Sequence, residues 1–369
     1  MSFSLAHVAP APCASENDVP RRNLQFSRGW EPAGAVDISE VGGGIPVRLG
    51  PMLGAAAPLP FDPGTLRPAS DLRRSGIEPS RGAWHHVRRG VWMDAGVWAT
   101  LDSTQKHAAF VHATALLRRL EEPVVCAVEA AAAVWGLPRI EAWPAFVRHH
   151  VCDRRVRGSA LLRPFLGAEV EPVERQGLLV TPVARTIVDL ARTGSLFTAV
   201  AAADHALRHE LCAAEDLAAE VSSVPARAPG RVRAAVVRDL ADPLSMSPGE
   251  SLSRVQMFRL NLPRPELQHA VHDDEGLAGT VDFWWEGVVG EFDGKTKYRV
   301  PAGASAEEAA EIVWREKKRE DRLRRKAAVG RWTYREAMQP QVLAQVLAQA
   351  GVTAVARPRW FDVGSGNVA

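Results

Sequence analysis

The chain has 369 residues, more than one ordinary hydrophobic core needs, and its length predicts two or three domains. Hydrophobic residues make up 46% and charged residues 24%, as in globular proteins, and a net charge of +2 leaves any affinity for nucleic acid to local basic patches. The four cysteines form no CxxC pair, which argues against a zinc ribbon or a disulfide framework and favours a reducing cytoplasm. With no apolar run of the roughly 18 residues that a membrane helix needs, and no signal peptide pattern, we expect a cytoplasmic protein without a membrane partner.

Residues 1–58 are rich in alanine, glycine and proline and follow neither the helical nor the strand period, so they are predicted to be a disordered leader. Met52 is an alternative translation start that the sequence leaves open.

The region 59–102 is predicted to be a winged-helix-like domain. A short helix ends near Gly76, and an alternating segment then reads as a strand, a turn at Gly90 and a second strand. Short helices followed by a basic hairpin are the parts of a winged helix, and Arg88 and Arg89 at its tip are expected to contact DNA phosphates. The alternative is a basic surface turn in a small structural domain.

Residues 103–242 are predicted to form a mostly helical middle domain. Helical periodicity covers 106–120, 127–135 and 199–211, and residues 178–192 read as a strand, a proline turn and a helix. Within that last helix, Arg185 and Asp189 are expected to form an internal salt bridge.

The remaining residues, 245–369, are predicted to form a mixed-sheet domain in the order α-β-β-β-α-β-α. Its first helix has a serine N-cap at Ser247, a proline at the first helical position and Glu250 three residues after the cap. The whole chain is therefore an α/β (α+β) multidomain protein by sequence.

Acidic residues interrupt the apolar strands of this last domain. Asp282 lies on one strand of a predicted hairpin, and Glu291, Asp293 and Lys295 alternate along the next, so the last three share one side. Acids among valine, phenylalanine and tryptophan are costly to bury unless something neutralises them. A divalent cation would neutralise them and leave the lysine to hold an attacking water or a developing phosphate charge.

This arrangement resembles the PD-(D/E)XK nuclease superfamily. More narrowly, it resembles the very-short-patch-repair-endonuclease-like domain at the C-terminus of many actinobacterial proteins, through residues 247–254, 263–268, 281–283, 290–295 and 315–321. The resemblance implies a restriction-endonuclease-like fold that hydrolyses phosphodiester bonds, with Asp282 and Asp293 as metal ligands and Glu291 or Glu250 as a further ligand. The metal implied is Mg²⁺ or Mn²⁺. Two registers remain open: Glu291 and Asp293 as the metal pair, or Asp293 and Lys295 as the acid–lysine pair, and both use Asp293.

A charged helix follows this predicted site over residues 307–328. Its excess charge is basic, and Lys318, Arg319 and Arg322 are expected to contact a nucleic-acid backbone, although most such runs are solvated faces with local ion pairs. Trp314 and Leu323 are predicted to face the core.

The earlier regions resemble the AbiEi-type antitoxin family through residues 87–92, 131–138 and 180–192. This resemblance implies a winged-helix transcriptional regulator and a toxin as a possible partner. Three functions therefore stay open: a metal-dependent endonuclease that acts on DNA in preference to RNA, a non-enzymatic regulator whose last domain only binds nucleic acid, or an RNA-processing or defence-system nuclease.

Overall fold

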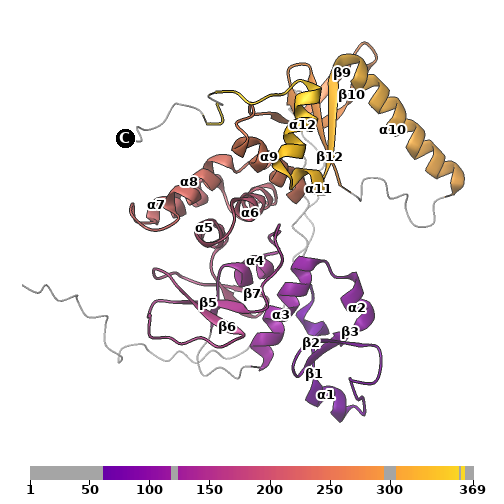
Figure 1. Cartoon of the computed structure of the whole chain (residues 1–369). Helices are drawn as coiled ribbons and strands as arrows, with labels where there is room; N and C mark the ends of the chain where they lie inside the picture. Colours follow the sequence, from indigo (N-terminus) through magenta and orange to yellow (C-terminus); the bar gives the residue numbers. More distant parts are fainter. Residues whose placement is uncertain (1–60, 118–123, 295–304, 357–358, 362–369) are drawn as a thin grey trace, which may run out of the picture. The chain divides into compact units, whose positions relative to one another are not determined.

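In the computed structural model of the chain, the described residues are 61–117, 124–294, 305–356 and 359–361. They all belong to one compact unit, Pro51–Ala369. Within these ranges, helices are combined with sheets of three, four and five strands, so the fold class is α+β, as predicted (Figure 1). The predicted leader and Met52 lie outside the described residues.

The first sheet is small and antiparallel, with strand order β1–β3–β2. The predicted hairpin is confirmed, and Gly90 makes its turn at a φ of +82°, a left-handed conformation that glycine adopts without steric cost. The elements are η1 (Pro63–Thr65), β1 (Arg67–Pro68), α1 (Ala69–Arg74), β2 (Trp84–Arg88), β3 (Val91–Asp94), α2 (Ala95–Thr100) and α3 (Ser103–Leu117).

A five-stranded mixed sheet with the order β6–β5–β4–β8–β7 lies in the region predicted to be mostly helical. Four of its strands were not predicted, because strands of two to five residues are too short to establish an alternating pattern. The elements are β4 (Val125–Cys126), α4 (Glu129–Trp135), β5 (Val147–Val151), β6 (Leu162–Leu166), β7 (Val173–Arg175) and β8 (Leu178–Val180).

Four helices follow this sheet: α5 (Val183–Thr193), α6 (Leu196–Arg208), α7 (Ala214–Ser223) and α8 (Arg231–Leu240). In α5 the expected salt bridge is confirmed, with Arg185 Nε 2.8 Å from Asp189 Oδ2. Both side chains are buried, so each charge neutralises the other in the protein interior rather than at the surface.

The last region has the predicted order of elements, with a one-turn helix added before the final helix. They are α9 (Pro248–Arg259), β9 (Glu266–Asp273), β10 (Gly276–Trp285), β11 (Val288–Asp293), α10 (Ala306–Lys326), β12 (Ala328–Thr333), α11 (Tyr334–Ala337) and α12 (Pro340–Ala350). The sheet order is β12–β11–β10–β9, and β12 is parallel to β11, with α10 as the crossover helix between them.

Helices cover both faces of this four-stranded sheet (Figure 1). Helix α10 contacts β9, β10 and β12, whereas α9 and α12 contact β11 and β12 from the other side. Successive residues of a strand face opposite sides, so the two helical layers receive alternate side chains of β11.

One hydrophobic core runs through the predicted boundary at residues 242–245. It joins side chains of α5 and α6, such as Ile187 and Val200, to Leu252 of α9 and to Phe292 and Trp332 of the four-stranded sheet. Helix α9 therefore packs against the preceding helices as well as against its own sheet.

Candidate active site

Strand β11 places Glu291 and Phe292 on opposite faces of the sheet. Phe292 belongs to the core on the α9 side, where its ring approaches Gly249. Glu291, one residue earlier, lies on the α10 side and pairs in register with Arg331 of β12. Asp293 is two residues after Glu291 and so shares its face, as the sequence predicted for these two acids.

Two arginines bind the carboxylate of Glu291. Arg319 Nη2 on α10 lies 2.7 Å from Oε1, and Arg331 Nη2 lies 2.9 Å from Oε2. Glu291 itself is buried. The two guanidinium groups supply the positive charge that the sequence argument assigned to a metal ion, so both oxygens of Glu291 are already neutralised.

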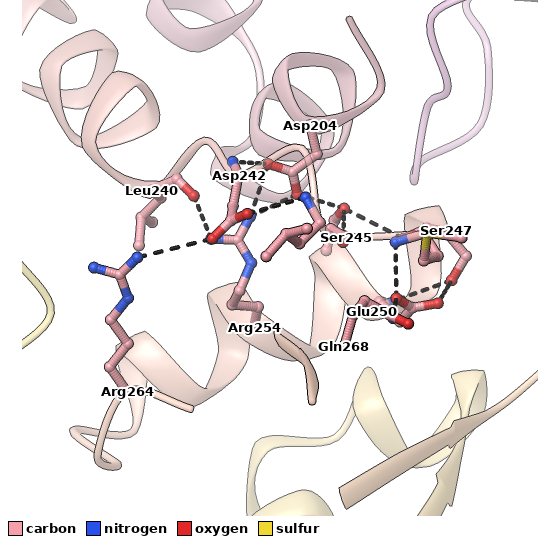
Figure 2. A network of polar contacts seen from close by, with 12 residues as sticks. Asp204, Leu240, Asp242, Ser245, Ser247, Glu250, Arg254, Arg264 and Gln268 are labelled. Atoms are coloured by element: carbon pink, nitrogen blue, oxygen red, sulfur yellow. Dashed lines mark hydrogen bonds and ion pairs between the residues drawn. The ribbon is translucent and has the colours of Figure 1, made fainter. Parts of the chain in front are cut away.

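Glu250 is engaged at the start of helix α9 (Figure 2). Its Oε1 accepts a hydrogen bond from Ser247 Oγ at 2.8 Å, and its Oε2 accepts from the Met246 N–H at 2.8 Å. The Ser247 hydroxyl in turn accepts from the Glu250 N–H. This confirms the N-terminal signal read from the sequence and gives the buried carboxylate a structural role on the α9 side, away from Glu291.

Gln268 on β9 binds one of the predicted acids, a role that could not be read from the sequence. Its Nε2 donates to Glu250 Oε2 at 3.2 Å, and its backbone has a φ of +51° inside a strand (Figure 2). A left-handed conformation is costly for a side chain with a Cβ, and such strain is often kept where a side chain must point in a set direction. No local sequence signal marks it, since glutamine is not a residue that favours this conformation.

Asp282 is a residue of β10, the strand between β9 and β11. Its neighbours pair with β9 on either side of Gln268, Val281 with His269 and Phe283 with Leu267. Its Oδ2 accepts a hydrogen bond from the Phe292 N–H at 2.9 Å. The β10–β11 ladder ends with the pair of Phe283 and Gly290. Asp282 is one step beyond this pair, and its side chain replaces a backbone acceptor. The bond brings this carboxylate to β11 next to the residue that precedes Asp293.

The remaining residues of the predicted site are Asp293 and Lys295. Asp293 is the half-buried last residue of β11, opposite Thr333 of β12, and Lys295 lies outside the described residues. In the described part of the chain, no three or more histidine, cysteine, aspartate or glutamate side chains are grouped to hold a metal ion. Among the predicted acids, the structure thus separates Glu250 and Glu291 into other interactions and leaves Asp282 and Asp293 on neighbouring strands.

Of the three cations predicted to contact nucleic acid on α10, two are bound internally. Arg319 pairs with Glu291 and with Glu316, and Arg322 binds Asp273 of β9 through Nε at 2.8 Å. The Arg322 guanidinium holds the pKa of the Asp273 carboxyl well below its usual range. Lys318 alone of the three is exposed.

The two hairpin arginines also differ. Arg89 is exposed next to the turn. The Arg88 guanidinium lies over the ring of Phe110 in α3, with its carbon 5.8 Å from the ring centroid, and its Nε and Nη1 atoms are buried. The phosphate-binding role predicted for both arginines fits the position of Arg89 better than that of Arg88.

The fold and the site define an α+β protein with a four-stranded mixed sheet and two aspartates where strands β10 and β11 separate. Over 140 residues the chain is 34% identical to two uncharacterized proteins from two strains of Mycobacterium tuberculosis, a stretch that covers 37% of this chain and 51% of each relative. The chain therefore spans about half the length of the curated relatives it matches. No protein-family model and no solved structure matches it. Among the described residues, no helix has both the length and the apolar character to cross a membrane.

Proposed function

We propose that the protein is a metal-dependent endonuclease-like protein that hydrolyses phosphodiester bonds in nucleic acid, DNA in preference to RNA. The observation that supports this most directly is the hydrogen bond from the Phe292 N–H to Asp282. It holds one carboxylate from β10 against the residue before Asp293, so acids from two neighbouring strands come to the same end of the sheet.

The geometry favours one of the two registers that the sequence left open. Glu291 is neutralised by Arg319 and Arg331, so the acid–lysine alternative with Asp293 and Lys295 is the better supported one. Asp282 and Asp293 would hold Mg²⁺ or Mn²⁺, and a bound metal supplies charge neutralisation and an acidified water. Mg²⁺ commonly uses one or two carboxylates together with substrate phosphates, which fits a two-aspartate set.

Cleavage of plasmid DNA and of RNA with Mg²⁺ or Mn²⁺ tests this proposal. Asp282→Asn and Asp293→Asn keep an oxygen acceptor but remove the negative charge, and each is expected to lower the rate by about a hundredfold or more. Asp274→Asn is the matched control, because Asp274 is a fully exposed residue of the β9–β10 turn. If the parent protein cleaves neither nucleic acid, or if Asp293→Asn cleaves as fast as the parent, the enzymatic proposal is wrong.

A non-enzymatic regulator is the second candidate. The specific observation in its favour is that the carboxylates of Glu291 and Glu250 are already engaged by arginines and by the start of α9. A regulator would bind its own promoter through the basic hairpin, with a toxin as a possible partner. In a mobility-shift assay at low salt, Arg89→Ala should weaken this binding more than Arg88→Ala, and the absence of any shift would remove this candidate.

A further inference from the structure

Trp314 breaks the pattern of the other tryptophans. Ten tryptophans lie in the described residues, and Trp314 is the only exposed one among them, with 57% of its surface accessible. The expectation that it faces the core is wrong, whereas Leu323, nine residues later on α10, is fully buried as predicted. Nine residues are two and a half helical turns, so the two side chains project from opposite sides of α10.

The surface around Trp314 is cationic rather than apolar. Its neighbours one turn away are Ala310, Glu311, Lys317 and Lys318, all exposed. The Lys318 ammonium lies 5.6 Å from the centroid of the Trp314 ring. Because these neighbours are small or charged, the described residues around Trp314 form no apolar patch of the kind that a folded protein partner covers.

Helix α10 divides its cations between two sides. Arg319 and Arg322 are bound to Glu291 and Asp273 of the sheet. In the described part of the chain, Lys317 and Lys318 have no carboxylate within ion-pair distance. Two ammonium groups that no described carboxylate neutralises, one of them beside an accessible indole, can bind an anionic ligand that also has a flat aromatic face.

We propose that Trp314, Lys317 and Lys318 bind an unpaired stretch of nucleic acid, with one base stacked on the indole and the lysines on the adjoining phosphates. An acidic peptide would satisfy the lysines but would leave the indole without a stacking partner. A base within a duplex presents only its edges, so the exposed ring selects for single strands. This inference rests on the proposed function, for which it names the substrate class.

Fluorescence anisotropy with a labelled single-stranded oligonucleotide tests it in the absence of divalent metal, in an Asp293→Asn background that prevents cleavage. Stacking contributes on the order of 1–3 kcal/mol per base, so Trp314→Leu should weaken single-strand binding by about 5- to 150-fold. Trp314→Tyr keeps a ring and should stay within about threefold of the parent, and binding of the matching duplex should change by less than about twofold.

The lysines are tested through the salt dependence of the same affinity. Replacing Lys317 and Lys318 by glutamine should make the slope of log affinity against log salt shallower by about 1.4, since each phosphate contact on a single strand contributes about 0.7. Arg335→Gln, at an exposed position outside α10, is the matched control and should leave the slope unchanged. Both positions on α10 are exposed, so thermal unfolding should be the same in all variants.

The inference is overturned if Trp314→Leu binds the single strand as tightly as the parent, or loses single-strand and duplex binding equally. It is also overturned if the parent does not bind the single strand at low salt. A protein that cleaves nothing but whose single-strand affinity depends on Trp314 would remove the endonuclease proposal and retain this one. If the protein cleaves nucleic acid but its single-strand affinity does not depend on Trp314, the endonuclease proposal is retained and this inference is removed.

Discussion

Asp204 of α6 and Arg254 of α9 form a buried ion pair across the boundary predicted between the middle and last regions. Arg254 Nη2 lies 2.7 Å from one carboxylate oxygen and 2.6 Å from the other, and both side chains are almost completely buried (Figure 2). Asp204 also accepts from the Ser251 hydroxyl and the Asp242 N–H. Burial raises the pKa of Asp204, and the Arg254 charge opposes that shift. The pair fixes α9, and with it Glu250, to the preceding helices.

Removing one member of this pair should be far more harmful than removing both. Arg254→Met leaves a buried carboxylate without its cation and should lower the free energy of unfolding by about 3–5 kcal/mol. Asp204→Leu combined with Arg254→Met should lose less than Arg254→Met alone, as measured by urea denaturation. The control is Arg238→Met, since the side chains of the Arg238–Asp239 pair are 37% and 34% accessible to solvent and the pair should contribute less than about 1 kcal/mol. Equal losses in the single and double variants would contradict this account.

Gly249 allows the start of α9 to lie directly on β11. A Cβ at this position would be 2.0 Å from Cζ of Phe292, a distance that no contact tolerates. Gly249→Ala should therefore lower the free energy of unfolding by about 2–3 kcal/mol. In an open helix the same change would raise it by roughly 1 kcal/mol, because alanine favours the helix more than glycine does. Because Phe292 precedes Asp293, the displaced strand should also reduce any nuclease activity.

A double-mutant cycle measured by urea denaturation checks this steric explanation. Phe292→Leu removes part of the ring that blocks the new methyl group, so Gly249→Ala should cost less in that background than in the parent. Strictly additive losses would show that the close approach of Gly249 and Phe292 is not the cause.

Much of the last region could be predicted from sequence because its signals are local. The serine cap, proline and Glu250 mark the start of α9, and the alternation around Asp282 and Glu291 marks the hairpin. The middle sheet could not be predicted, because its short strands acquire their identity from neighbours far away in sequence, such as Val125 beside Leu179.

The site was harder to predict than the fold, because the sequence around a carboxylate does not show which cation, a metal ion or a side chain, will neutralise it. Glu291 seemed to require a metal, yet its charges come from Arg319 on a helix that the sequence assigned to nucleic acid and from Arg331 on the next strand. Gln268 carries no local signal at all, since its role depends on strained backbone geometry. Trp314 was misassigned because apolar character alone does not fix the side of a helix that faces the core.

The two arginines around Glu291 lead to a prediction that separates structure from metal binding. Glu291→Gln keeps the shape of the side chain but removes the buried anion that both guanidinium groups share. Arg319 keeps its pair with Glu316 and Arg331 its pair with Glu320, so the free energy of unfolding should fall by about 1–3 kcal/mol. Mn²⁺ affinity measured by calorimetry should stay within about twofold of the parent, whereas Asp293→Asn should lose about tenfold or more. Glu286→Gln, in the exposed β10–β11 turn, is the control for both measurements. A large loss of Mn²⁺ affinity in Glu291→Gln would make Glu291 a metal ligand after all.

Two buried histidines on α3 should make the protein sensitive to mild acid. His107 stacks on Trp143 with ring centroids 4.6 Å apart, and His112 meets Phe61 edge-on at 5.4 Å. In the described part of the chain, the Nε2 atom of each is buried without a hydrogen-bond partner. Burial lowers the pKa of both rings from 6.5 to about 4, with the Arg139 charge adding to the effect at His107.

The sign of the pH dependence follows from these directions. Between pH 6.5 and about 4 the unfolded chain binds protons that the folded protein excludes, so stability is complete above pH 6.5 and falls as the pH is lowered. From pH 7 to pH 5 each ring should remove about 2 kcal/mol of unfolding free energy. The double variant His107→Phe/His112→Phe should lose correspondingly less over this interval, whereas His272→Phe, at an exposed position, should follow the parent. If the unfolding free energies of the parent and the double variant fall in parallel as the pH is lowered, these two rings are not the cause of the loss, and the prediction is wrong.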